Sequence, residues 1–412
     1  MKKIPATVFL GWTILLFTGI QNAESQVKTG IEVLVERDFD LLAGKRVGLV
    51  TNPTGVDSQL RSTIDILDAH VNLILLFGPE HGVRGEFGAG DHVGDQVDDR
   101  TGIPVVSLYG SSRKPDKDAL EQVDVIVYDI QDIGTRSYTY ISTMGLLMEA
   151  AAETGKEVVI LDRPNPLGGI RVEGPLVDDG FHSFVSQYSI PYVYGLTCGE
   201  LALYLNGEGL LAGGVSCNLH VVPMEGWDRS MTFEQTGLPW VPTSPHIPDH
   251  RTAFYYPATG IIGELDPSMI GIGYTLPFQV LVTGSIDAHL LADAMNGLEL
   301  DGIIFRPIYL KPYYMEKQGQ ELQGVQIHIT DPARAPLTEI QFWFLQEAHK
   351  LDPGFDPFEG RENRYRMFDQ VCGSDLVRSS LMNDFDFTRA ESYWNSQVES
   401  FTKTAIQYYL YK

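Results

Sequence analysis

A glutamate and a histidine stand side by side where a run of apolar residues ends. Residues 71–77 (VNLILLF) have the composition of a buried strand, and Glu80 and His81 follow in the loop 78–82 (GPEHG). A carboxyl group in that position meets little water, and desolvation raises a carboxyl pKa. Such a group suits a general acid or base near neutral pH. Glu80 is therefore the first catalytic candidate, and a solvated loop residue or a helix-capping partner is the alternative.

The same loop continues into further charged residues. Arg84 and Glu86 follow within six positions of Glu80, and Glu86 precedes the flexible sequence FGAG at 87–90. Glu86 is a second candidate for a catalytic carboxylate.

A second polar cluster follows the apolar run at 123–128 (VDVIVY). Asp129 and Asp132 come directly after this run, and Arg136 and Tyr138 lie a few residues later. An arginine side chain can bind a carboxylate through two parallel hydrogen bonds. The pattern predicts a ligand-binding loop; the alternative is that one aspartate caps the next helix and pairs with Arg136.

A third loop, 162–169 (DRPNPLGG), could line the same site. Its prolines fix the backbone and its glycines allow a ligand to approach closely. Asp162 and Asn165 could then hydrogen-bond sugar hydroxyls, although a purely structural turn is the alternative.

A fourth segment, 243–250 (TSPHIPDH), carries two histidines four positions apart. His246, Asp249 and His250 could bind a metal ion. The two prolines of the segment argue against the helix that would place the histidines on one face. We expect instead a loop that lines the site, with Ser244 and His246 as its polar groups, and no metal.

These loops need a scaffold that brings them together. Five short apolar or β-branched runs, each ending in a turn-forming sequence, occupy 46–51, 71–77, 105–109, 123–128 and 157–161. Helical spacing of apolar residues fills 59–69 and 140–154. This alternation predicts an α/β fold with a Rossmann-like parallel sheet covered on both faces, whose strands end on one rim. No GxGxxG sequence follows the first run, so we expect no dinucleotide cofactor.

The character of the sequence changes after about residue 240. Residues 239–257 contain five prolines, and a second α/β pattern follows. We expect a helix at 287–298, a strand at 325–330, and helices at 338–349 and 393–408. The sequence therefore predicts a Rossmann-like catalytic domain over 26–240 and a smaller α/β or α+β auxiliary domain over 241–412.

Residues 1–25 have the features of a signal peptide. Lys2 and Lys3 precede a short apolar run from Val8 to Ile20, and small residues stand near position 25. The run is short for a membrane span, although an uncleaved anchor is the alternative. We expect an exported protein, periplasmic or secreted, with no membrane span in the mature chain.

Charge and cysteine content limit the possible partners. The chain carries a net charge of −24, and nucleic-acid binding requires a basic face. Nucleic acid is therefore excluded as a partner. In an oxidising compartment Cys198 and Cys217 could form a disulfide, which would leave Cys372 free.

Several of these segments together resemble a known family. They are TNPTGVD (51–57), FGPEHGVRG (77–85), SLYG (107–110), DIQDIGTRSYTYISTM (129–144), LDRPNPLGGIRVEG (161–174), GELA (199–202), PTSP (242–245) and GVQIHITD (324–331). The chain resembles the NamZ-type exo-β-N-acetylmuramidases of glycoside hydrolase family 171. The resemblance implies a site in the cleft between a Rossmann-like domain and an auxiliary domain. It also implies release of N-acetylmuramic acid from the non-reducing ends of peptidoglycan fragments.

The resemblance assigns roles to single residues as well. Glu80 would be the catalytic glutamate, and the sugar site would be lined by His81, Arg84, Asp129, Arg136 and Asn165. Because they lie in the same group of loops, we add to the predicted substrate-binding set Asn52, Asp132, Tyr138, Asp162, Ser244 and His246.

One stretch departs from the family pattern. Where the family has Glu-Gly-Thr-Asn followed by Gly-Arg-Gly-Thr, this chain has ELDP at 264–267 and GIGY at 271–274. Glu264 would be the equivalent acid, but the Asn and the Arg are missing. If that Arg binds the lactyl carboxylate in the relatives, this chain prefers another sugar or a modified chain end.

Glycoside hydrolysis normally uses two carboxyl groups. They lie about 5–5.5 Å apart in retaining enzymes and roughly 6.5–9.5 Å apart in inverting enzymes. We predict Glu80 as the proton donor. Its partner could be Glu86, Glu264 or Asp129, and the acetamido group of the substrate is a further possible nucleophile.

Two other functions stay open at this point. One is a non-catalytic protein that binds peptidoglycan or sugars, which the missing Arg and Asn favour. The other is a metal-dependent amidase or deacetylase that uses His246, Asp249 and His250.

Overall fold

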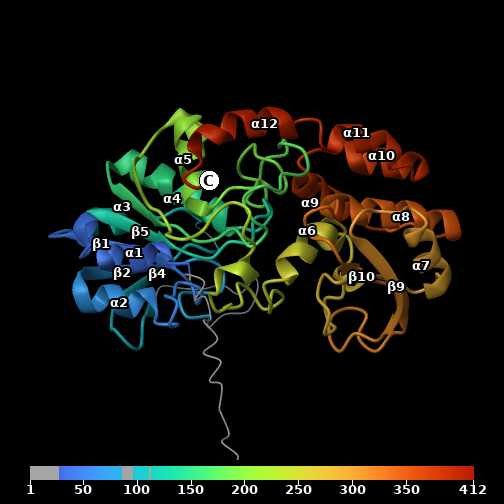
Figure 1. Cartoon of the computed structure of the whole chain (residues 1–412), viewed down its shortest axis with the longest axis horizontal. Helices are drawn as coiled ribbons and strands as arrows, with labels where there is room; N and C mark the ends of the chain where they lie inside the picture. The colour runs from blue at the N-terminus through green and yellow to red at the C-terminus, as the bar shows by residue number, and fades with distance from the viewer. Residues whose placement is uncertain (1–26, 86–95, 111–112) are drawn as a thin grey trace, which may run out of the picture.

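The computed structural model describes residues 27–85, 96–110 and 113–412, which form two α/β units lying side by side (Figure 1). The segment predicted to be a signal peptide and the candidate Glu86 lie outside the described residues.

The first unit is built on a seven-stranded sheet of order β3-β4-β2-β1-β5-β6-β7. Every neighbouring pair is parallel except β3 and β4. The strands are β1 (Arg46–Thr51), β2 (Asn72–Gly78), β3 (Gln96–Val97), β4 (Pro104–Ser107), β5 (Val125–Asp129), β6 (Glu157–Leu161) and β7 (Asn218–Val222). All five predicted strands are confirmed. The apolar runs of β1, β5 and β6 are buried almost throughout, as expected for strands covered on both faces of a sheet, whereas β4 is only partly buried. The edge strand β7 was not predicted, since its sequence NLHVV is mostly half-buried and has no continuous apolar run.

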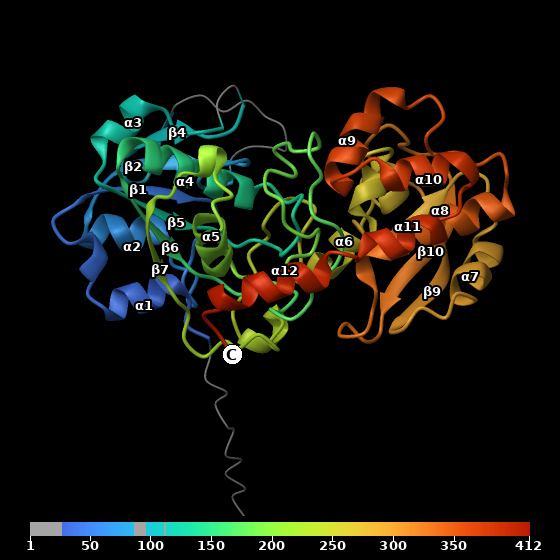
Figure 2. The ribbon, with the colours of Figure 1, turned by 90° about the horizontal axis from the view of Figure 1, so that it is seen from above.

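Helices cover both faces of this sheet (Figures 1 and 2). One apolar core contains side chains of α1 (Gly30–Glu36) and α2 (Thr63–His70). The other contains side chains of α3 (Lys117–Gln122), α4 (Tyr140–Thr154) and α5 (Cys198–Gly207). The predicted bounds of α4 are confirmed. α2 begins later than the predicted residue 59, because the Ser62 hydroxyl accepts a hydrogen bond from the Ile64 amide and caps the helix there.

The strand order contains a switch point beside β1. From β1 the chain moves outward through β2 to β4, and then returns to the other side of β1 for β5, β6 and β7. In open parallel sheets a ligand-binding crevice forms at the carboxyl ends of the strands at this point. The loops that follow β1, β2 and β5 are therefore the ones best placed to form a site.

The second unit is smaller and contains a three-stranded antiparallel sheet of order β8-β10-β9. Its strands are β8 (Val280–Thr283), β9 (Ile303–Leu310) and β10 (Leu322–Ile329). Its helices are α6 (Thr252–Gly263), α7 (Ala288–Asn296), α8 (Ile340–Leu351), α9 (Glu362–Cys372) and α10 (Leu376–Asp384). The helices predicted near 287–298 and 338–349 and the strand predicted near 325–330 are confirmed.

The prediction of a single late helix over 393–408 is wrong. The structure has two helices, α11 (Thr388–Trp394) and α12 (Val398–Ala405). The Asn395 side chain accepts a hydrogen bond from the Gly174 amide at 2.8 Å, and the Gln397 side chain accepts one from the Leu176 amide at 3.0 Å. The polar residues between the helices thus bind the first unit, and the helix is interrupted there.

The end of the chain returns to the first unit, where Figures 1 and 2 both show α12 reaching toward α5. The rings of Phe401 and Tyr408 both contact the ring of Tyr204 on α5 edge-on, at centroid distances of 5.2 and 5.6 Å. The predicted division at residue 240 assigns Phe401 and Tyr408 to the C-terminal domain, but both pack on the first unit.

The three cysteines are free thiols in the structure, and all three are buried. The disulfide considered for Cys198 and Cys217 is therefore absent. Within residues 27–85, 96–110 and 113–412, no helix is long and apolar enough to cross a membrane.

Candidate active site

Glu80 lies in a tight turn directly after β2. His81 and Gly82 both have left-handed backbone conformations, with φ of +73° and +77°, and the Gly82 amide donates to the Pro79 carbonyl at 3.0 Å. A left-handed conformation is costly for a residue with a side chain and is often found at functional sites. The turn leaves Glu80 half-buried, and the Thr139 hydroxyl donates to Glu80 Oε2 at 3.1 Å.

Three tyrosines from different elements lie around the Glu80 carboxylate. They are Tyr109 after β4, Tyr140 at the start of α4 and Tyr256 in α6 of the second unit. Burial raises the pKa of each phenol, and the negative charge of Glu80 raises all three further. The charge of Glu80 thus acts on phenol groups from both units of the protein.

A second carboxylate approaches this cluster from the second unit. Glu264 ends α6, and its charge acts on Tyr256 together with that of Glu80. Burial raises the pKa of Glu264, and the charge of Arg364 opposes that rise. Arg364 Nη2 lies 2.9 Å from Glu264 Oε2, and its Nε donates to the Glu264 carbonyl at 2.6 Å. The guanidinium beside Glu264 therefore comes from α9 rather than from the divergent stretch 264–274.

Hydroxyl groups connect the two units next to Glu80. Ser137 Oγ lies 3.2 Å from the hydroxyls of both Tyr192 and Tyr256. The Tyr138 hydroxyl donates to Thr243 Oγ1 at 2.7 Å and is close enough to Ser244 for that residue to lower its pKa, although burial raises the pKa overall. The loop after β5 is thereby fixed against the segment that leads into the second unit.

Two histidines complete this group. His81 lies close enough to His246 for its charge to lower the pKa of His246, which burial also lowers as the larger cause. His246 Nε2 lies 3.0 Å from the hydroxyl of Tyr314, on the loop between β9 and β10. Thus His81 of the first unit, His246 of the connecting segment and Tyr314 of the second unit meet beside Glu80.

Residues 47–251 match the family described as "Exo-beta-N-acetylmuramidase NamZ, N-terminal", and residues 254–411 match its C-terminal counterpart. This chain belongs to that family. The chain is 40% identical over 388 residues to the peptidoglycan beta-N-acetylmuramidase NamZ of Bacillus subtilis strain 168, covering 94% of this chain and 92% of that protein.

Two solved structures of Bacteroides fragilis NCTC 9343, both described as DUF1343 family proteins, share the fold. One is 54% identical with a TM-score of 0.90, and the other is 28% identical with a TM-score of 0.72. Each alignment covers 94% of this chain and 99% of the solved chain. The family identified from the strand-end loops and the two-unit architecture are thus confirmed.

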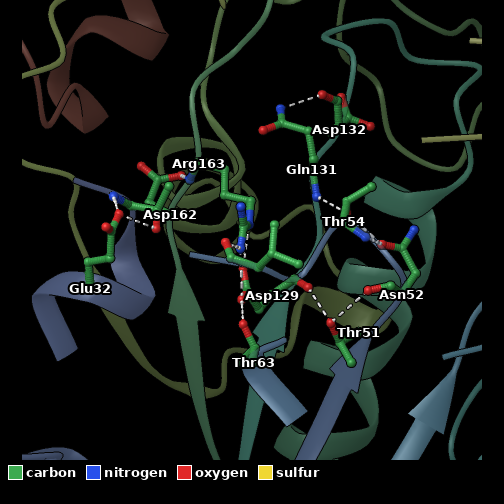
Figure 3. A network of polar contacts seen from close by, with 12 residues as sticks. Glu32, Thr51, Asn52, Thr54, Thr63, Asp129, Gln131, Asp132, Asp162 and Arg163 are labelled. Carbon is green, nitrogen blue, oxygen red and sulfur yellow. Dashed lines mark hydrogen bonds and ion pairs between the residues drawn. The ribbon is translucent and has the colours of Figure 1, made fainter. Parts of the chain in front are cut away.

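Several residues predicted to bind the sugar instead hold the loops together. Asp129 is fully buried and is paired with Arg163, whose Nε and Nη2 lie 2.5 and 3.0 Å from its two carboxylate oxygens (Figure 3). The Thr63 hydroxyl also donates to Asp129 at 2.5 Å. Asp129 is therefore unavailable to substrate, and the sequence reading missed Arg163 as its partner.

Arg136 is also fully buried, and its role as a sugar ligand is corrected. Its guanidinium donates to the carbonyls of Pro175, Ile190, Val371 and Cys372 at 2.6–3.0 Å. Two of these acceptors belong to the first unit and two to the end of α9. Arg136 thus joins the two units from the inside, and it pairs with neither aspartate of its own loop.

Asp162 and Asn165 are structural as well. Asp162 accepts hydrogen bonds from the Thr197 hydroxyl at 2.7 Å and the Gly199 amide at 2.8 Å. Asn165 accepts from the Leu167 amide and donates to the Leu196 carbonyl, both at 3.0 Å. Both side chains are buried, so the structural turn considered from the sequence describes this loop correctly.

Arg84 holds the loop after β2. It pairs with Asp98 at 2.5 Å and with Asp65 at 3.1 Å. These carboxylates raise the pKa of the Arg84 guanidinium, while its own partial burial lowers it. In this structure Arg84 positions the loop that carries Glu80.

Asn52 and Asp132 each keep one buried polar atom without a hydrogen-bond partner among the described residues. In Asn52, Oδ1 accepts from the Thr54 amide and hydroxyl, and Nδ2 is the unpartnered atom. In Asp132, one oxygen accepts from the Tyr194 hydroxyl and the Gly134 amide, and Oδ1 is unpartnered. Burial raises the pKa of Asp132 to about 7, although these two hydrogen bonds oppose the rise. Figure 3 shows both residues in the loops at the switch point.

The metal site considered for the fourth loop is not formed. Asp249 pairs with Arg251 at 2.9 Å, the His250 ring stacks on Phe233, and His246 faces Tyr314. Among the described residues, no group of three or more His, Cys, Asp and Glu side chains could hold a metal ion.

Sequence reasoning missed the residues that approach Glu80 from a distance. Thr139 and Tyr140 lie inside the segment 129–144, one of those that resemble the family, so the motif alone could have indicated them. Tyr256 and Arg364 lie in helices with no motif, and only tertiary packing brings them to the site.

Proposed function

We propose that this chain is an exo-β-N-acetylmuramidase that releases N-acetylmuramic acid from the non-reducing ends of peptidoglycan fragments, with Glu80 as its general acid. The observation that carries the proposal is the position of Glu80. It is half-buried at the carboxyl end of β2, receives a hydrogen bond from Thr139, and is close enough to tyrosines of both units for its charge to act on them, in a chain of this family.

In this mechanism the Glu80 carboxyl group protonates the glycosidic oxygen as the bond to the leaving sugar breaks. The Thr139 hydroxyl holds the carboxyl group in one orientation. A positioned acid contributes about 10²–10⁴-fold to the rate. The half-buried environment limits the water that competes for the proton.

Glu264 is the second carboxyl group of the proposal. Asp129 is excluded by its buried ion pair with Arg163, and Glu86 lies outside the described residues. The Glu264 side chain is 30% exposed, so substrate can reach it. Its raised pKa makes it a stronger base than an ordinary glutamate. Its position supports a role in activating water or in stabilising the positive charge that develops on the sugar.

Export is part of the proposal, because the substrate belongs to the cell wall. The charged and apolar start of the chain supports a periplasmic or secreted location. The test is the N-terminal sequence of the protein from the periplasm or medium, which we expect to begin near residue 26. Retention of Met1 on a cytoplasmic protein would contradict it.

The catalytic assignment is tested with a chromogenic β-N-acetylmuraminide. We expect Glu80→Gln to lower kcat by at least about 100-fold. The matched control is Glu121→Gln, an exposed glutamate on α3, which should keep normal turnover. A folded Glu80→Gln variant with near-normal kcat would exclude the assignment. A wild-type chain that binds muropeptides without any turnover would instead indicate a non-catalytic binding protein.

A further inference from the structure

Large aromatic side chains gather on the surface of the second unit near the end of β9. Tyr309 is 59% exposed, and Tyr313, in the loop between β9 and β10, is 65% exposed. Exposed aromatic residues that are grouped together mark binding surfaces more often than scattered ones do. The Tyr313 ring is stacked on that of Tyr274, with centroids 5.7 Å apart and planes 11° from parallel.

These three tyrosines line one groove, which we call the tyrosine groove. It is completed by polar side chains, and its lining includes Tyr274, Tyr309, Tyr313, Lys311 and Gln323. The space has a volume of about 730 Å³, which is in the range of small-ligand sites. Glu321 lines the groove as well and pairs with Lys311 at 2.9 Å. Flat aromatic surfaces bordered by this ammonium–carboxylate pair and an amide suit a ligand that has both C–H faces and polar groups around its rim.

The loop that carries Tyr313 is held rigidly. The Tyr313 amide donates to the Gly273 carbonyl at 2.7 Å, and the Gly319 amide donates to Pro312 at 2.9 Å. Met315 has a left-handed backbone, with φ of +77°, a conformation that persists only where surrounding contacts enforce it. The groove is therefore largely formed before a ligand arrives, which reduces the entropy lost on binding.

The same loop also borders the proposed catalytic site. Tyr314, next to Tyr313, lies 3.0 Å from His246, and His246 is close enough to His81, the residue after Glu80, for the charge of His81 to act on it. Farther along the loop, Lys317 pairs at 2.6 Å with Asp266, two residues after Glu264. One loop thus contacts the surroundings of both proposed carboxyl groups and forms one wall of the tyrosine groove.

We propose that the tyrosine groove binds the sugars on the leaving-group side of the bond that is cut. This inference rests on the proposed function. An enzyme that removes a terminal sugar holds one residue of the glycan beside its carboxyl groups, and the rest of the chain must lie outside. The apolar faces of pyranose rings pack on tyrosine rings, and their hydroxyl and acetamido groups can bond to Lys311 and Gln323.

The test compares two substrates. One is the chromogenic muraminide, which has no sugar on the leaving-group side, and the other is a peptide-free tetrasaccharide of peptidoglycan with terminal N-acetylmuramic acid. We expect Tyr313→Ala to lower kcat/KM on the tetrasaccharide about tenfold, the equivalent of about 1.4 kcal/mol. Its kcat/KM on the chromogenic substrate should fall less than twofold. The matched control is Ile304→Ala, which removes a 54% exposed side chain from the same strand outside the groove.

Two results would overturn the proposal. One is an equal loss on both substrates, and the other is a loss confined to peptide-bearing fragments, which would assign the groove to the stem peptide. A binding measurement separates this inference from the catalytic one. In the Glu80→Gln background, Tyr313→Ala should raise the Kd for the tetrasaccharide about tenfold, whether or not the chain is catalytic. An unchanged Kd would reject the groove, and a wild type that turns over neither substrate would reject only the proposed function.

Discussion

The hydroxyl of Tyr411 donates a hydrogen bond of 2.6 Å to Asp162 Oδ2, and so joins the end of the chain to the end of β6. The Met224 amide donates to the same hydroxyl at 2.9 Å. Asp162 is fully buried, and burial raises its pKa to about 6. A tail that has passed through the second unit thus completes the polar core of the first.

We expect Tyr411→Phe to destabilise the protein by about 1–3 kcal/mol, because it removes a hydrogen-bond donor from a buried carboxyl group. The measurement is the free energy of unfolding in urea. Tyr408→Phe is the matched control, since its hydroxyl bonds to Glu208 on the surface, and it should change stability little. Equal effects of the two substitutions would show that the bond to Asp162 is not stabilising.

Asp132 should make stability depend on pH. Its pKa is raised from 3.8 to about 7 by burial, so the folded protein holds this proton more tightly than the unfolded chain does. The stability that comes from protonated Asp132 is fully present below the unfolded pKa and is lost as pH rises toward about 7. Asp162, whose pKa burial raises to about 6, should likewise lower the stability as pH rises toward about 6.

Replacing Asp132 with Asn should flatten this dependence. We expect unfolding free energies measured at pH 5 and pH 8 to differ less in Asp132→Asn than in the wild type, by up to roughly 1.4 kcal/mol for each pH unit of the window. Asp118→Asn, an exposed residue on α3, should keep the wild-type slope. If the free energy of unfolding changed equally with pH in all three proteins, Asp132 would not hold a proton in the folded state.

The pair between Arg364 and Glu264 should set the acidic limb of the activity profile. If Glu264 acts as a carboxylate, removal of the positive charge in Arg364→Gln raises the pKa of Glu264 and moves the acidic rise in kcat/KM to higher pH. The measurement is kcat/KM against pH with the chromogenic substrate. Arg366→Gln, an exposed arginine of the same helix, serves as the control. An unmoved acidic limb would exclude Glu264 from the ionisation that controls activity.

The sheet of the first unit was predictable wherever a strand carries a continuous apolar run, which the edge strand β7 lacks. The sequences RVGLVT and EVVIL form β1 and β6 at the predicted residues, since strands covered on both faces need continuous apolar side chains. The loops after the strands were found for the same reason. The sequence could not show which polar loop residues face substrate.

Asp129 illustrates why the partners of the loop residues stayed hidden. An aspartate after a strand can bind a ligand or stabilise a neighbouring loop, and the local sequence looks the same in both cases. Its partner Arg163 lies 34 residues along the chain and arrives with the loop after β6. The contributions of Tyr256 and Arg364 depend on how the second unit docks, which local sequence does not encode.

Arg136 offers the sharpest test of this distinction. Arg136→Lys distinguishes a residue that binds the sugar from one that only joins the two units. Lysine keeps the positive charge, but it lacks the planar guanidinium that donates to four carbonyls. If Arg136 has a structural role, its replacement should lower the free energy of unfolding by roughly 3–5 kcal/mol, because four buried carbonyls lose their hydrogen-bond donors. The folded fraction should keep its KM for the chromogenic substrate. Arg306→Lys, an exposed arginine on β9, is the control and should leave stability unchanged. A variant of normal stability with a strongly raised KM would restore Arg136 to the sugar site.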